Sequence, residues 1–62
     1  MMNTHEYTFR DSQKAFQDAI DKGILNEQPS SNMYAGNYMY MFTEASGQDA
    51  FKHINTRKYI RI

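Results

Sequence analysis

The chain has 62 residues, no cysteine and a formal net charge of zero, from seven basic and seven acidic side chains. This length allows one small domain, and the lack of cysteine excludes disulfides and thiolate metal sites. Leu, Ile, Val and Phe together number only ten, below the share of about a fifth that accompanies most packed cores. Disorder of this kind normally comes with a large net charge, and five Tyr and five Met add bulk. The composition therefore predicts one folded domain over residues 1–62, with a core of Tyr, Phe and Met.

The first residues of the chain are polar. Residues 1–6 are expected to be frayed, although the segment 6–9 (Glu-Tyr-Thr-Phe) could add a short strand. A basic cluster followed by an apolar run is lacking, and no apolar stretch reaches the roughly 18–20 residues of a transmembrane helix. We therefore expect a cytoplasmic protein without membrane contact.

A helix is predicted at about residues 10–22. Ala15, Phe16, Ala19 and Ile20 recur at helical spacing and form an apolar stripe. Thr8 and Asp11 are alternative N-caps. Gly23 follows the last turn and is a typical helix stop.

Three strands are predicted after the polar loop 26–32. The segment 33–43 is dense in Tyr, Met and Phe and favours a strand at about 36–44. The segment 50–54 is ambiguous: as a strand it forms a hairpin with the preceding one, and as a helix it begins at Ser46. We favour the strand, because turn residues flank it on both sides. A last strand is predicted at about 58–62. The predicted fold is α+β, with one helix packed on a three-stranded antiparallel meander.

The segment 38–42 is bulky on both sides, which one helix cannot cover. Strict alternation places Tyr38, Tyr40 and Phe42 on one face and Met39 and Met41 on the other. The sequence leaves open which face meets the helix, but either arrangement leaves an apolar face exposed. Such faces are often interaction sites.

The charges are unevenly distributed along the chain. Residues 1–49 carry all seven acidic side chains and only three basic ones, whereas 50–62 carry four basic side chains and no acidic one. A basic segment on an acidic body suits a polyanion or a second copy of the same body. The candidate binding residues are Tyr38, Tyr40, Phe42, Lys52, Arg57, Lys58 and Arg61.

Three interpretations of the exposed face remain open. A second copy of the chain or another protein covers it, which we favour. Alternatively, the aromatic rings stack on single-stranded nucleic acid while the basic residues contact phosphates. In the third, the strand 33–43 is twisted and the chain termini and the loop 26–32 fold over it, which suffices because Tyr tolerates partial exposure. The zero net charge weighs against nucleic acid.

Nothing in the sequence indicates catalysis. Histidine can act as a general base, but no nucleophile or carboxylate is placed beside His53 by sequence, so an edge-strand histidine is the better interpretation. Asp18 and Asp21 alternate with lysine, as on a solvated helix face. We expect a non-enzymatic protein without metal or cofactor.

The blocks 34–41 (Tyr-Ala-Gly-Asn-Tyr-Met-Tyr-Met), 51–53 (Phe-Lys-His) and 56–60 (Thr-Arg-Lys-Tyr-Ile) resemble short uncharacterised proteins of bacteria and their temperate phages. The helix with Ala15-Phe16, Ala19-Ile20 and Gly23 is similar too, so that the resemblance covers about two thirds of the chain. This group has no defined activity, and no binding residue is carried over. The resemblance implies a small intracellular accessory protein of a bacterium or prophage.

Overall fold

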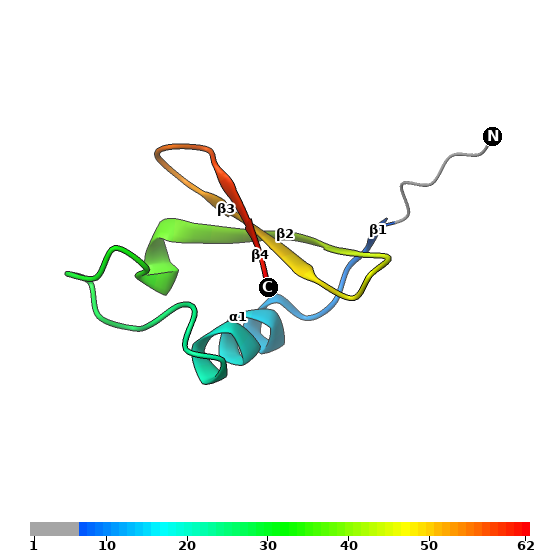
Figure 1. Ribbon diagram of the computed structural model, residues 1–62, viewed down its shortest axis with the longest axis horizontal. Helices are drawn as coiled ribbons and strands as arrows, with labels where there is room; N and C mark the ends of the chain where they lie inside the picture. The colour runs from blue at the N-terminus through cyan, green and yellow to red at the C-terminus, as the bar shows by residue number, and fades with distance from the viewer. Residues whose placement is uncertain (1–6) are drawn as a thin grey trace.

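The computed structural model describes residues 7–62 as one helix packed on one antiparallel sheet (Figure 1). The predicted fraying of residues 1–6 lies outside the described residues. The elements follow the order β1 (Tyr7–Thr8), α1 (Ser12–Asp21), the 3₁₀ turn η1 (Ala35–Asn37), β2 (Tyr38–Glu44), β3 (Asp49–His53) and β4 (Tyr59–Arg61).

The sheet has four strands in the order β1-β2-β3-β4, all antiparallel. The predicted meander is β2-β3-β4, and β1 extends it at the edge formed by β2. The ambiguous segment 50–54 is a strand, because Phe51 pairs with Tyr40 on one side and with Ile60 on the other. A central strand satisfies the backbone hydrogen bonds of this short segment on both edges.

The helix begins and ends for local reasons that the sequence contains. Asp11 is the N-cap, and its side chain accepts a hydrogen bond from the Gln13 backbone N–H at 3.0 Å. At the other end Gly23 has a φ of +76°. The Ile24 N–H donates to the Ala19 carbonyl at 3.0 Å and the Gly23 N–H to the Ile20 carbonyl at 2.9 Å, which is a Schellman ending.

The strand β2 begins later than predicted, at Tyr38 rather than at about residue 36. The Asn37 N–H bonds back to the Tyr34 carbonyl at 3.0 Å, which closes the turn η1. A side chain on Gly36 would collide with the Tyr34 ring, since its Cβ would lie 2.5 Å from two ring carbons. Glycine therefore permits the close approach of the Tyr34 ring at a turn where alternation alone predicts a strand.

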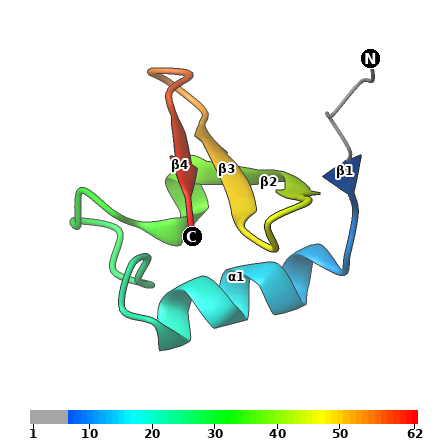
Figure 2. The same cartoon turned by 45° about the vertical axis from the view of Figure 1, so that its right-hand side comes forward.

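The core lies between α1 and one face of the sheet, here called the inner face. Figures 1 and 2 both show α1 along one side of the strands, and no other helix of residues 7–62 lies over the opposite side. Ala15, Ala19, Leu25 and Phe51 are fully buried together. The Phe16 and Phe51 rings meet edge to face, with centroids 4.9 Å apart.

Candidate functional site

The sheet face turned away from α1, here called the outer face, is the main candidate site. Its side chains follow from the strand register, because partners across a ladder share a face. The outer face comprises Tyr7, Met39, Phe42, Glu44, Ala50, Lys52, Tyr59 and Arg61.

Phe42 reaches the outer face because of a β-bulge. Tyr40 pairs with Phe51, yet Phe42 pairs with Ala50, so that β2 contains one more residue here than β3. Met41 is this extra residue. Because of it, each side chain of β2 after Met41 points to the sheet face opposite to the one that strict alternation predicts. The prediction that Phe42 shares a face with Tyr38 and Tyr40 is therefore wrong.

Tyr38 and Tyr40, two of the predicted binding residues, lie on the inner face and pack against the core. The Tyr40 ring contacts Phe51, with centroids 5.8 Å apart. These two tyrosines belong to the side that meets the helix, which answers the question that the sequence left open. They cannot form a platform on the open side of the sheet.

Three aromatic rings form a row across the outer face instead. Tyr7 and Phe42 lie 4.3 Å apart between centroids, and Phe42 and Tyr59 lie 6.2 Å apart. Tyr7 and Tyr59 come from the two edge strands and Phe42 from between them. Sequence reasoning missed Tyr7 and Tyr59 as site residues, because their ring contacts with Phe42 depend on the bulge and on the pairing of β1 with β2.

Large apolar side chains of the outer face remain in contact with solvent. The exposed fractions are 48% for Tyr7, 45% for Met39 and 39% for Tyr59. Phe9, just after β1, is 76% exposed. Grouped exposure of this kind is unusual for a chain that acts alone, whereas single exposed apolar residues are ordinary.

Two cations flank the aromatic row. The Lys52 ammonium lies 5.6 Å from the centre of the Tyr59 ring, and the Arg61 guanidinium carbon lies 5.7 Å from it. Arg61 also donates to Glu44 at 2.9 Å, and this contact raises the pKa of Arg61. The structure thus brings together three predicted site residues, Phe42, Lys52 and Arg61.

The remaining two predicted site residues, Arg57 and Lys58, lie in the turn between β3 and β4. Arg57 has a φ of +64°, an unfavourable conformation for a side chain other than Asn, Asp or Gly. His53 shapes the same turn, because its Nδ1 accepts from the backbone N–H groups of Asn55 and Thr56 at 3.1 and 3.2 Å. His53 thus has a structural role in the turn.

A ring of hydrogen bonds on the inner face, here called the polar ring, was not predicted. It is formed by Arg10, Tyr40, Thr43 and Asp49. The Arg10 backbone N–H donates to the Tyr40 hydroxyl at 3.1 Å, and that hydroxyl lies 2.6 Å from Thr43 Oγ1. Thr43 Oγ1 donates to Asp49 Oδ1 at 2.7 Å, and Arg10 Nε donates to the same oxygen at 3.1 Å. Because Thr43 gives its only proton to the carboxylate, Tyr40 donates to Thr43.

The polar ring is structural in character. Asp49 is buried, and a second contact from Arg10 Nη2 makes the ion pair bidentate. Hydrogen bonding to Arg10 holds the pKa of Asp49 below its usual value, while the carboxylate raises the pKa of Arg10. Every buried side-chain nitrogen or oxygen among residues 7–62 has a partner. The Asp49 carboxylate is poorly suited to proton transfer, because its oxygens already accept hydrogen bonds from Arg10 and Thr43.

Two further observations bear on the kind of site. In the described part of the chain, no three His, Asp or Glu side chains gather closely enough to hold a metal ion. Within residues 7–62, α1 is far too short and too polar to cross a membrane.

The comparisons with known proteins add no relative. No protein-family model, curated protein or solved structure matches this chain.

Proposed function

We propose that the chain is a non-enzymatic interaction module that binds another protein through the outer face, and that the first such partner is a second copy of itself. The observation that carries the proposal is the aromatic row on a sheet face that no helix of residues 7–62 covers: Tyr7 and Tyr59 are exposed, and Phe42 between them is partly buried. Tyr, Met and Arg, which are enriched in interface cores, are all present there.

The energetics favour a cover for this face. Burial of one large apolar side chain contributes roughly 1.5–3 kcal/mol. A domain of this size is expected to have a free energy of unfolding of only about 3–9 kcal/mol. Tyr7, Met39 and Tyr59 are already about half buried, so covering the rest of each would contribute roughly half of that value. Together the three contributions are still a sizeable share of the stability that the isolated domain has.

Charge on the outer face is compatible with a second copy. Glu44 lies at one end of β2, whereas Lys52 pairs with Met39 near the other end. A two-fold axis in the plane of the interface and perpendicular to the strands would set Glu44 of each copy toward Lys52 of the other. Such an isologous contact is the commonest form of self-association.

Sedimentation velocity from low to high micromolar concentration tests this proposal. We expect a concentration-dependent dimer, and we expect Tyr59→Ser to shift it toward monomer. The matched control is Ile24→Ser, which removes an exposed apolar side chain that follows α1. A well-folded chain that stays monomeric throughout would refute self-association, and so would equal effects of the two substitutions.

Single-stranded nucleic acid is the second candidate ligand. The specific observation in its favour is that Lys52 and Arg61 flank the Tyr59 ring while Arg57 and Lys58 occupy the adjoining turn. Aromatic stacking combined with phosphate contacts is how sheet faces bind single strands without strict sequence preference. Asp11, Asp18 and Asp21 lie on or beside α1, on the other side of the sheet.

Fluorescence anisotropy with a labelled oligothymidine tests this candidate. Binding should weaken steeply with added salt and should be reduced by Lys58→Ala, but not by the control Lys14→Ala on α1. Absence of binding at low salt would remove this candidate. Tight binding by a strictly monomeric protein would instead place nucleic acid ahead of a second copy.

A further inference from the structure

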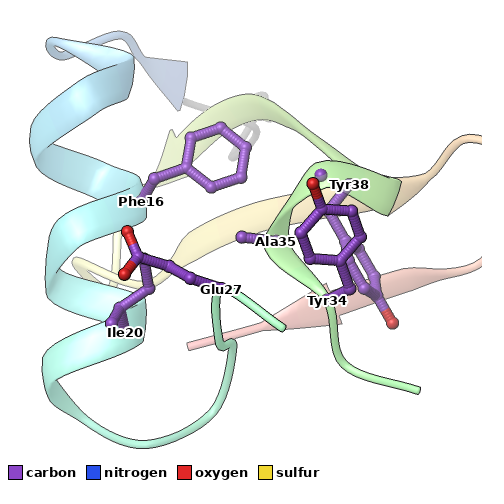
Figure 3. A pocket seen from close by; sticks show the side chains of 7 residues that line it. Phe16, Ile20, Glu27, Tyr34, Ala35 and Tyr38 are labelled. Carbon is purple, nitrogen blue, oxygen red and sulfur yellow. The ribbon is translucent and has the colours of Figure 1, made fainter. Parts of the chain in front are cut away.

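A groove separates α1 from the segment that leads into β2, on the opposite side of the sheet from the outer face. Its cavity volume is about 480 Å³. The lining residues are Phe16, Ile20, Glu27, Tyr34, Ala35, Gly36 and Tyr38 (Figure 3).

Two tyrosines form one wall of the groove and are held in place. Tyr34 lies over Gly36, and only the missing side chain of glycine allows this approach. The Tyr38 hydroxyl donates to Met33 Sδ at 3.7 Å, and the Tyr38 ring meets the His53 ring edge to face with centroids 5.0 Å apart. The aromatic wall is therefore pre-organised by the fold.

Glu27 supplies the charge. Figure 3 shows its side chain reaching toward α1, near Phe16 and Ile20 and across the groove from Tyr34. Among the hydrogen bonds and ion pairs of residues 7–62, none involves the Glu27 carboxylate. None of the seven lining residues carries a positive charge. Glu27 is solvent-exposed, so the groove presents one carboxylate without a salt-bridge partner, together with the rings of Phe16, Tyr34 and Tyr38.

The loop around Glu27 is fixed by backbone hydrogen bonds. The Asn26 N–H donates to the Met33 carbonyl at 3.0 Å, and the Ala35 N–H donates to the Asn26 carbonyl at 2.7 Å. Asn26 Oδ1 accepts from the Gln28 N–H at 3.0 Å. These contacts bring Glu27 and Tyr34, seven positions apart in sequence, to one groove as a built arrangement.

We propose that this groove binds a small organic ammonium ion with an apolar body. An ammonium group is attracted both by a carboxylate and by the faces of aromatic rings. The apolar body would lie against Phe16, Ile20 and Ala35. The volume lies within the range of small-molecule sites, so we take the occupant to be a free amine.

Titration of ¹⁵N-labelled protein with 3-phenylpropylammonium tests the proposal, with 3-phenylpropanol as the uncharged counterpart. The amide signals of Phe16, Glu27 and Gly36 should shift with the ammonium ion. The affinity for the alcohol should be about tenfold lower than that for the ammonium ion, or lower still, because the alcohol lacks the charge. Equal binding of the two compounds, or shifts confined to residues outside the groove, would overturn the proposal.

Two variants extend the test. Glu27→Gln should weaken binding of the ammonium ion about two- to fivefold, as expected for an ion pair with an exposed carboxylate. The control Asp21→Asn removes the same charge from an exposed residue that does not line the groove, and it should leave binding unchanged. Gly36→Ala should weaken binding by displacing the Tyr34 ring. Thermal melts establish that each variant is folded, and a folded Glu27→Gln protein with unaltered affinity would contradict the proposal. A lysine-containing tetrapeptide that binds while the free amine does not would also overturn it.

Discussion

The two faces of the sheet differ in what covers them. The inner face is covered by α1, centred on Phe51, and sealed at one end by the polar ring. The outer face has a comparable aromatic content in Tyr7, Phe42 and Tyr59, yet no helix of residues 7–62 packs on it. Similar residues thus serve different purposes, because a single short helix can cover one face only.

The sharpest test of this difference compares two phenylalanines. Phe51→Ala should cost about 3–5 kcal/mol, since it leaves a cavity at a fully buried position of the inner face. That loss is a large part of the expected stability, so the variant should unfold at a much lower urea concentration. Phe42→Ala on the outer face should cost only about 1 kcal/mol. Urea unfolding followed by circular dichroism measures both, and equal costs would contradict the distinction between the faces.

The polar ring predicts an acid-sensitive contribution to stability. Because Arg10 lowers the pKa of Asp49 in the folded state, the contribution is complete above the unfolded pKa of 3.8 and is lost as pH falls through the folded pKa. At neutral pH Asp49→Asn should cost about 2 kcal/mol. Below about pH 4 the gap between the two proteins should narrow.

Urea midpoints at neutral and acidic pH measure this effect. The control is Asp21→Asn, which changes an exposed carboxylate that accepts from Gln17. It should leave the pH dependence close to that of the unmodified protein. A gap that stays constant on acidification would show that the Asp49 charge does not stabilise the inner face.

A smaller effect is expected from the hydroxyl that closes the polar ring. Tyr40→Phe should cost about 1 kcal/mol, because the Arg10 N–H and Thr43 Oγ1 both lose a partner. Tyr38→Phe is the matched control on the same face, and it removes only a long contact to the Met33 sulfur. Thermal unfolding distinguishes the two variants. A larger loss of stability for Tyr38→Phe would contradict the stabilising role assigned to the polar ring.

The smallest effect concerns the turn between β3 and β4. Arg57→Asn should stabilise the protein by about 0.5 kcal/mol, because Asn tolerates a positive φ better than Arg does. Lys58→Asn, at a neighbouring position without a positive φ, should show no such gain. Both variants remove one charge, so that a shared gain in thermal stability would point to charge repulsion as the cause instead.

Local signals explain which parts of the fold could be predicted. The helix was predicted correctly because Asp11, the Ala15 to Ile20 stripe and Gly23 act within a few residues of one another. The hairpin strands followed from alternating apolar residues between turn residues. The turn η1 was missed because the apolar alternation of 33–43 does not encode the backbone hydrogen bond from Asn37 to Tyr34 that closes it.

The candidate site was only partly predictable for the same reason. Phe42, Lys52 and Arg61 do lie together, but Tyr38 and Tyr40 face the helix. One extra residue at Met41 separates these two groups, and a bulge is set by the pairing of β2 with β3. The polar ring likewise could not be predicted from the sequence, because Arg10 and Asp49 lie 39 positions apart in the chain.

By itself the sequence determined that the chain is an α+β domain with more apolar strand surface than one helix can bury. That follows from composition and short-range periodicity, which do not depend on how the elements meet. Only the tertiary structure decided which rings remain exposed, because the facing of each side chain after Met41 depends on pairing between strands. It also decided where the carboxylate of Asp49 is paired and where that of Glu27 is not.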